Sequence, residues 1–126
     1  MKIDICLAVL NKLEYTKKFV DSVFKSTRSD FDLIVTNNGS SDETLSWLES
    51  LSLSNLKIID FPKNMGCAVG WNAALKAGEN NYRVLTQNDI QFSKDWDIPL
   101  ISFLEENSDF MAAGSMEIGN MSFSQD

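Results

Sequence analysis

The chain changes abruptly from apolar to polar side chains in the stretch Tyr82-Arg83-Val84-Leu85-Thr86-Gln87-Asn88-Asp89-Ile90-Gln91-Phe92. Residues 82–86 are typical of a short buried strand, and Gln87, Asn88 and Asp89 stand where that strand would end. A second polar group, residues 37–42, follows the apolar run 31–35 in the same way. Because open α/β sheets bind ligands at the carboxyl ends of their strands, the two polar groups together indicate one cleft.

Strand-like and helix-like segments alternate along the chain. Besides the strand at 82–86, apolar runs predict strands over residues 3–10, 31–35, 56–61 and 110–113. Helical periodicity predicts helices over residues 14–27, 67–77 and 97–106. It also predicts a helix that opens at residues 40–43 and has Leu45, Leu48 and Leu51 as its apolar stripe. Ser40 and Glu43, three residues apart, predict a capping box at the start of that further helix. This order of elements predicts one α/β domain over residues 1–126, with a mostly parallel sheet and helices on both faces.

Composition excludes several classes of function. The 126 residues carry a formal charge of −7, which argues against a nucleic-acid backbone or an anionic membrane as the main partner. The chain has no His, which rules out a Ser-His-Asp triad and a His-ligated zinc site. No segment approaches the run of about 20 apolar residues that a membrane helix needs. Cys6 and Cys67 lack metal-ligand spacing and are predicted to be reduced structural cysteines of a cytoplasmic protein.

The polar groups have chemistry that fits a ligand site. Asp89 can bind a hard cation such as Mg²⁺ or Mn²⁺ through its carboxylate, and the neutral carbonyl of Gln87 adds a weaker ligand. The amide of Asn37 can pair with the edge of a base. Gly66 and Gly70, around the start of the helix at 67–77, let a ligand approach the backbone. Taken one at a time, each group also fits a purely structural role as a turn, a helix cap or a close packing contact.

Three motifs occur in order at compatible distances. They are Ile34-Val35-Thr36-Asn37-Asn38-Gly39-Ser40-Ser41-Asp42-Glu43-Thr44, then Asn64-Met65-Gly66 with Gly70-Trp71-Asn72-Ala73-Ala74-Leu75, then Val84-Leu85-Thr86-Gln87-Asn88-Asp89-Ile90. The set resembles the family 2 glycosyltransferases, whose pattern runs approximately V-D-N-G-S-x-D-x-T, N-x-G-x-x-x-G-x-N-x-G and L-x-N-x-D-V. The similarity covers about residues 3–114.

The resemblance implies a Rossmann-like GT-A fold, truncated or minimal, that binds a nucleotide-diphosphate sugar with Mg²⁺ or Mn²⁺. It implies transfer of the sugar, with inversion, to an unknown acceptor that is a glycan, a lipid-linked molecule or a protein. Asp89 falls at the family's metal-binding position. The implied nucleotide-sugar-binding residues are Val9, Leu10, Asn11, Asn37, Asn38, Gly66, Asn72, Gln87 and Asn88. A homo-oligomer is a further hypothesis for a partner.

The chain departs from the family pattern at several positions. Asn37 replaces the usual Asp, Gln87 replaces an acidic or Asn residue, and Trp71 stands where many relatives carry an Arg. The acceptor-binding half is expected to be missing or reduced, so no general base is assigned; Glu117 and Asp126 fit that role by their order alone. These departures keep a second hypothesis open, a non-catalytic module that binds nucleotide sugars or serves in an assembly. A nucleotidyltransferase is less favoured, because the chain has no basic Gly-rich phosphate loop.

Overall fold

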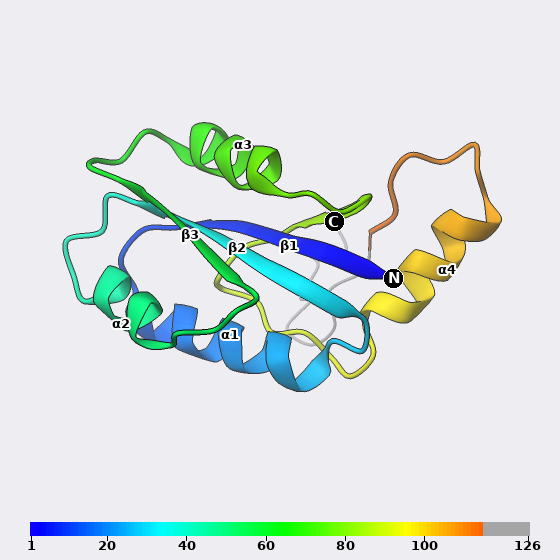
Figure 1. The fold of residues 1–126 in the computed structure, drawn as a ribbon, viewed down its shortest axis with the longest axis horizontal. Helices are drawn as coiled ribbons and strands as arrows, with labels where there is room; N and C mark the ends of the chain where they lie inside the picture. Colours follow the sequence, from blue (N-terminus) through cyan, green and yellow to red (C-terminus); the bar gives the residue numbers. More distant parts are fainter. Residues whose placement is uncertain (115–126) are drawn as a thin grey trace, which may run out of the picture.

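The structure is a computed structural model and describes residues 1–114. Its elements are, in chain order, β1 (Lys2–Val9), α1 (Leu13–Ser26), β2 (Asp30–Asn38), α2 (Thr44–Ser50), β3 (Leu56–Phe61), α3 (Cys67–Ala77), β4 (Tyr82–Leu85) and α4 (Asp97–Glu106). The strands form one sheet in the order β3-β2-β1-β4, and every neighbouring pair is parallel. Helices α1 and α2 cover one face and α3 covers the other, whereas α4 lies near the amino end of β1 (Figure 1). The predicted α/β class, with a parallel sheet between helices, is confirmed.

Alternation along β1 produces a core on each face of the sheet. Ile3, Ile5, Leu7 and Val9 pack into the larger core, which includes Phe19 of α1. The intervening side chains face α3, where Cys6, Ile34 and Ala74 form a smaller buried cluster. This division follows from the two-residue period of a strand.

Helix α3 packs unusually close to the sheet. A Cβ atom added to Gly70 would lie 2.8 Å from the Cβ atom of Ala8 on β1, so a larger residue at position 70 would push the helix away. Burial, assisted by the carboxylate of Asp4, raises the pKa of the Cys6 thiol to about 12. Cys6 is therefore an unreactive core residue, as predicted, whereas Cys67 is exposed at the first position of α3.

Two local predictions were wrong, because contacts with residues distant in the sequence override the local signals. Strand β2 does not end near Val35 but continues to Asn38, because Asn37 and Asn38 pair in register with Asp60 and Phe61 of β3. The capping box is absent: α2 begins at Thr44, and its N-cap residue, Glu43, makes no capping hydrogen bond. The backbone N–H of Thr44 bonds instead to the Oδ1 atom of Asp42 at 2.9 Å. The hydroxyl of Ser40 instead accepts a hydrogen bond from the backbone N–H of Asn11 at 2.8 Å.

The predicted strand at residues 110–113 does not form. The backbone N–H of Phe110 bonds to the carbonyl of Asn107 in a turn, and the Phe110 ring packs edge-on against Phe103 of α4 with centroids 5.2 Å apart. Met111 is fully exposed. Phe110 thus packs on the neighbouring helix instead of entering the sheet. Across residues 1–114, no helix combines the length and the apolar character needed to cross a membrane.

Candidate functional site

The carboxyl ends of the parallel strands lie at one edge of the sheet, on the opposite side from α4 (Figure 1). We call this the carboxyl edge: residues 9–12 after β1, residues 37–42 at the end of β2, residues 60–66 at the end of β3 and residues 86–89 after β4. Most of the predicted site residues lie there. Val9 is buried in the core, however, and only the following Leu10 is exposed at the edge.

Asn11 ties the first two loops of the carboxyl edge together. Both Asn11 and Lys12 adopt left-handed backbone conformations, with φ of 54° and 55°. The Asn11 Oδ1 atom accepts hydrogen bonds from the backbone N–H groups of Ser41 at 2.7 Å and Asp42 at 3.2 Å. The pKa of Asp42 lies below its ordinary value, first because of the Thr44 side chain and then because of backbone N–H donors, among them that of Thr44 at 2.9 Å. The loop after β1 is therefore fixed against the approach to α2.

Asn38 holds the segment that leads into α3. Its side chain is buried, its Nδ2 atom donates to the carbonyl of Gly66 at 3.0 Å, and its Oδ1 atom accepts from the N–H of Met65 at 2.9 Å. Gly66 is exposed, has a φ of 91°, and has no atom within 4 Å of the position that a Cβ would take. The backbone at the start of α3 is thus both fixed and open to a ligand.

Asn37 lies beside Asn38 in β2 but contacts the neighbouring strand. It is buried, and its Nδ2 atom donates to the Oδ1 atom of Asp60 at 2.9 Å. Its own Oδ1 atom faces the N–H of Ser40 at 3.4 Å. Asp60 was not singled out from the sequence; its signal was a charged residue near the end of an otherwise largely apolar strand.

Three polar residues follow β4: Asn88 is held by a hydrogen bond, and Gln87 and Asp89 are exposed. Asn88 donates through Nδ2 to the hydroxyl of Thr16 in α1 at 3.1 Å. Gln87 and Asp89 are exposed, and within residues 1–114 the Asp89 carboxylate has no ion-pair or hydrogen-bond partner. Asp89 is thus free to bind a ligand.

A metal ion fits Asp89 only together with a ligand that brings further oxygens. Residues 1–114 contain no group of three or more His, Cys, Asp or Glu side chains that could hold a metal. Mg²⁺ commonly binds proteins through one or two carboxylates together with substrate phosphates and water, and one exposed carboxylate meets that requirement. Asp89 alone therefore leaves most of the coordination positions of such an ion to water or to a bound ligand.

Some predicted residues lie apart from these contacts. Asn72 is exposed on α3, two residues along from Gly70, whereas Gly70 and Ala74 face the sheet. A step of two residues turns a helix by about 200°, so the Asn72 side chain points away from the sheet. Glu117 and Asp126 lie outside the described residues.

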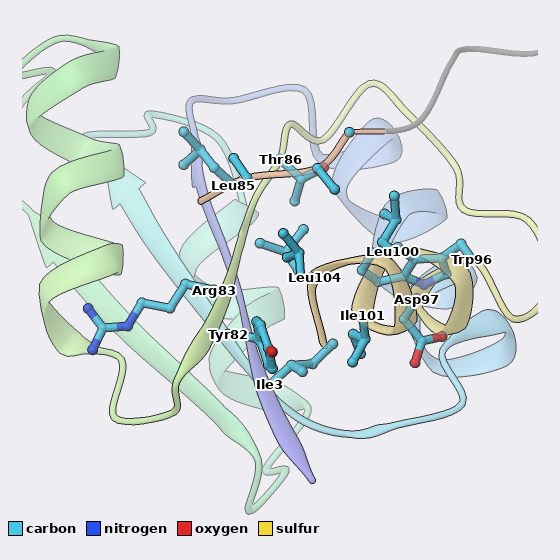
Figure 2. A pocket seen from close by; sticks show the side chains of 14 residues that line it. Ile3, Tyr82, Arg83, Leu85, Thr86, Trp96, Asp97, Leu100, Ile101 and Leu104 are labelled. Atoms are coloured by element: carbon cyan, nitrogen blue, oxygen red, sulfur yellow. The ribbon is translucent and has the colours of Figure 1, made fainter. Parts of the chain in front are cut away.

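A cavity of about 450 Å³ lies between β4 and α4 and touches the carboxyl edge at Thr86. Figure 2 shows Tyr82, Leu100, Ile101 and Leu104 around it, with Arg83 directed away from the rest. Asp97, at its side, accepts hydrogen bonds from the backbone N–H groups of Arg28 at 3.0 Å and of Ser29 at 2.9 Å. Burial acts to raise the pKa of Asp97, but these bonds outweigh it and leave the pKa below its ordinary value. Asp97 therefore anchors α4, and the cavity contains none of the predicted site residues.

Comparison with known proteins identifies one family that matches nearly the whole chain. The family model for glycosyl transferase family 2 matches residues 4–125. An uncharacterized glycosyltransferase of Haemophilus influenzae is 28% identical over 115 residues, which are 90% of this chain and 36% of that protein.

Two solved structures share the fold. Residues 1–349 of S. aureus TarS in complex with UDP superpose with a TM-score of 0.76 at 24% identity, over 86% of this chain and 33% of that one. The mannosyltransferase PcManGT of Pyrobaculum calidifontis, in complex with GDP-Man and Mn²⁺, gives a TM-score of 0.68 at 18% identity, over 82% of this chain and 31% of that one. The chain thus spans about a third of the length of each of these proteins. From the family match over nearly its whole length and from its GT-A-like fold, the chain belongs to glycosyl transferase family 2.

Proposed function

We propose that this chain binds a nucleotide-diphosphate sugar at the carboxyl edge, together with Mg²⁺ or Mn²⁺, and takes part in transferring the sugar to an acceptor. The observation that carries the proposal is the arrangement of loops there: Asn11 and Asn38 fix the loops, while Gly66 and Asp89 stay open. The UDP bound to TarS and the GDP-Man and Mn²⁺ bound to PcManGT support this class of ligand.

The diphosphate is expected to lie across the start of α3. Asn38 holds the backbone at Met65 and Gly66 in place, and the missing side chain of Gly66 leaves room for phosphate oxygens near the free N–H groups of the helix. Asp89 would hold the metal ion jointly with those oxygens. When bound, the ion neutralises negative charge on the departing nucleoside diphosphate.

Charge makes the metal ion necessary for tight binding. The chain carries a formal charge of −7, which opposes an anionic ligand. A divalent cation next to Asp89 reverses the local charge where the diphosphate would lie. We therefore expect nucleotide binding to depend on the metal, and metal binding to depend on the nucleotide.

We further propose that transfer inverts the anomeric centre and that the acceptor is a glycan, a lipid-linked molecule or a protein. Family membership supports inversion, and no residue of 1–114 is assigned as the general base. A non-catalytic nucleotide-sugar binder or assembly subunit is the second candidate. It is favoured by the use of Asn11, Asn37 and Asn38 in internal hydrogen bonds. The assembly form predicts an oligomer, which size-exclusion chromatography at several concentrations would detect.

Sugar-nucleotide hydrolysis separates the two candidates. The wild-type chain, Asp89→Ala and Asp30→Ala are incubated with UDP- and GDP-sugars, with and without Mn²⁺, and release of the nucleoside diphosphate is measured. Asp30 is an exposed carboxylate at the amino end of β2, so Asp30→Ala is the matched control. The enzyme proposal predicts Mn²⁺-dependent release by the wild type and by Asp30→Ala, and its loss in Asp89→Ala. Equal Mn²⁺-dependent release by Asp89→Ala would remove Asp89 from the mechanism. Metal-dependent binding without release from any donor would favour the non-catalytic module.

A further inference from the structure

The pair formed by Asn37 and Asp60 is the least expected contact of the carboxyl edge. The two residues are register partners on β2 and β3, and the Asn37 amide donates to Asp60 Oδ1 at 2.9 Å. Asn37 is 2% exposed, whereas Asp60 is exposed even though the other five residues of β3 are half-buried. Asp60 makes no ion pair or further hydrogen bond within residues 1–114. A buried amide thus holds an exposed carboxylate in a fixed orientation, with its Oδ2 atom unpaired.

The position of Asp60 limits the part of a ligand that it can contact. Strands β3 and β4 are the two outer strands of the sheet, so Asp60 and the polar group containing Asp89 lie three strand spacings apart, about 14 Å. A carboxylate repels phosphate oxygens unless a cation stands between them. A nucleoside diphosphate whose metal-bound phosphates lie near Asp89 would therefore have its uncharged base, with N–H donors, at the Asp60 end.

We infer that Asp60, oriented by Asn37, binds the nucleobase and determines which base the site accepts. This inference rests on the proposed function. An ionised carboxylate only accepts hydrogen bonds. Uracil and guanine carry an N–H at the ring nitrogen of the pairing edge. Cytosine and adenine offer a carboxylate only their exocyclic amino group, and the lone pair of the unprotonated ring nitrogen beside it repels the carboxylate. Asp60 therefore favours UDP or GDP and disfavours CDP and ADP.

Isothermal titration calorimetry with Mn²⁺ and UDP, GDP, CDP or ADP tests the inference. The variants are Asp60→Asn, which keeps the shape and removes the charge, and Asp30→Asn, a matched control that removes an exposed carboxylate at the amino end of β2. A double variant, Asn37→Asp with Asp60→Asn, exchanges the amide and the carboxylate between the two hydrogen-bonded positions. Thermal unfolding of each variant without ligand checks that it folds.

The wild type is expected to bind UDP or GDP at least about tenfold more tightly than CDP and ADP, a difference of about 1.4 kcal/mol. Asp60→Asn should lose most of that preference, because its amide can now donate to the ring nitrogen of cytosine or adenine. Asp30→Asn should keep the preference. In the double variant the buried carboxylate at position 37 accepts from the new amide at position 60, which leaves the carbonyl oxygen of that amide to accept from the N–H of the base, so the preference should be recovered in part.

Three results would overturn the inference. The first is unchanged selectivity in Asp60→Asn. The second is a wild-type chain that binds nucleotides without discrimination, which leaves the proposed function intact. The third is a double variant that folds but shows no recovered preference, which contradicts the pairing of Asn37 with Asp60. A wild-type chain that binds no nucleotide at all would instead remove the proposed function, and the inference with it.

Discussion

Replacing Asn38 by Ala should release the segment before α3 while leaving the sheet intact. The Asn38 side chain is 4% exposed and makes both of its hydrogen bonds to the backbone of that segment, at 3.0 Å to Gly66 and 2.9 Å from Met65. A hydrogen bond of this kind contributes about 0.5–1.5 kcal/mol net, and an unpaired buried partner costs more. Met65 and Gly66 are exposed, so water replaces the lost bonds in part. We therefore expect Asn38→Ala to lower the free energy of unfolding by about 1–3 kcal/mol.

For a chain of this length the loss corresponds to a fall in Tm of roughly 5–10 °C. Circular dichroism during heating measures the fall in Tm. Hydrogen exchange shows which segment is released, because the Met65 amide should lose its protection. Asn38→Asp keeps the acceptor for Met65 and loses the donor to Gly66, so it should destabilise the chain while the Met65 amide stays protected. Asn72→Ala, at an exposed position on α3, is the matched control and should leave Tm within about 1 °C of the wild type. An Asn38→Ala variant with the Tm and the Met65 exchange rate of the wild type would refute the reasoning.

Further changes probe the other contacts of the fold and the carboxyl edge. Gly70→Ala should cost about 1–3 kcal/mol by pushing α3 from β1, and adding Ala8→Gly should restore part of the midpoint of urea unfolding; no effect in either variant would contradict the close packing. Asn11→Gly and Asn11→Ala both remove the oxygen that binds the loop at 40–42, but Ala should be less stable than Gly by about 1 kcal/mol in the same assay because φ is 54° there. Asp97→Asn should destabilise the chain near neutral pH. Because folding lowers the pKa of Asp97, its contribution is complete above the ordinary value of 3.8 and is lost as the pH falls through the lower folded value. Denaturant unfolding at several pH values should therefore show the difference from the wild type shrinking below about pH 4, and a constant difference would contradict it.

Local sequence signals predicted the elements well where no distant contact competed with them. The bounds of β3, α3 and α4 agree with the predicted ranges, because each has a clear apolar period and α3 lies between two glycines. Asn37 and Asn38 were assigned to a loop because polar side chains usually end a strand. Their amides find partners in Asp60 and in the segment before α3, which keeps them in β2.

The candidate site was predicted only in part, because some of its contacts join residues that are distant in the sequence. Strand ends and the family motifs located Asn11, Asn38 and Asp89 at one edge of the sheet, although their roles toward a ligand stay predictions. The capping box predicted at Ser40 was wrong, because the Ser40 hydroxyl bonds to Asn11, which lies 29 positions earlier. The charge of Asp60 near the end of β3 was visible in the sequence, but its contact with Asn37 could not be predicted, because that contact depends on the register of β2 against β3.

Thermal unfolding with UDP and GDP, each with and without Mn²⁺, shows whether the carboxyl edge is a nucleotide-sugar donor site. At about 100 times its Kd, a ligand should stabilise the wild-type chain by about 2.7 kcal/mol, which is a shift of several degrees. We predict that the shift requires Mn²⁺, that Asp30→Ala, which removes an exposed carboxylate at the amino end of β2, keeps it, and that Asp89→Ala loses it. No shift with either nucleotide, or the same Mn²⁺-dependent shift in Asp89→Ala, would contradict a metal-dependent donor site built on Asp89.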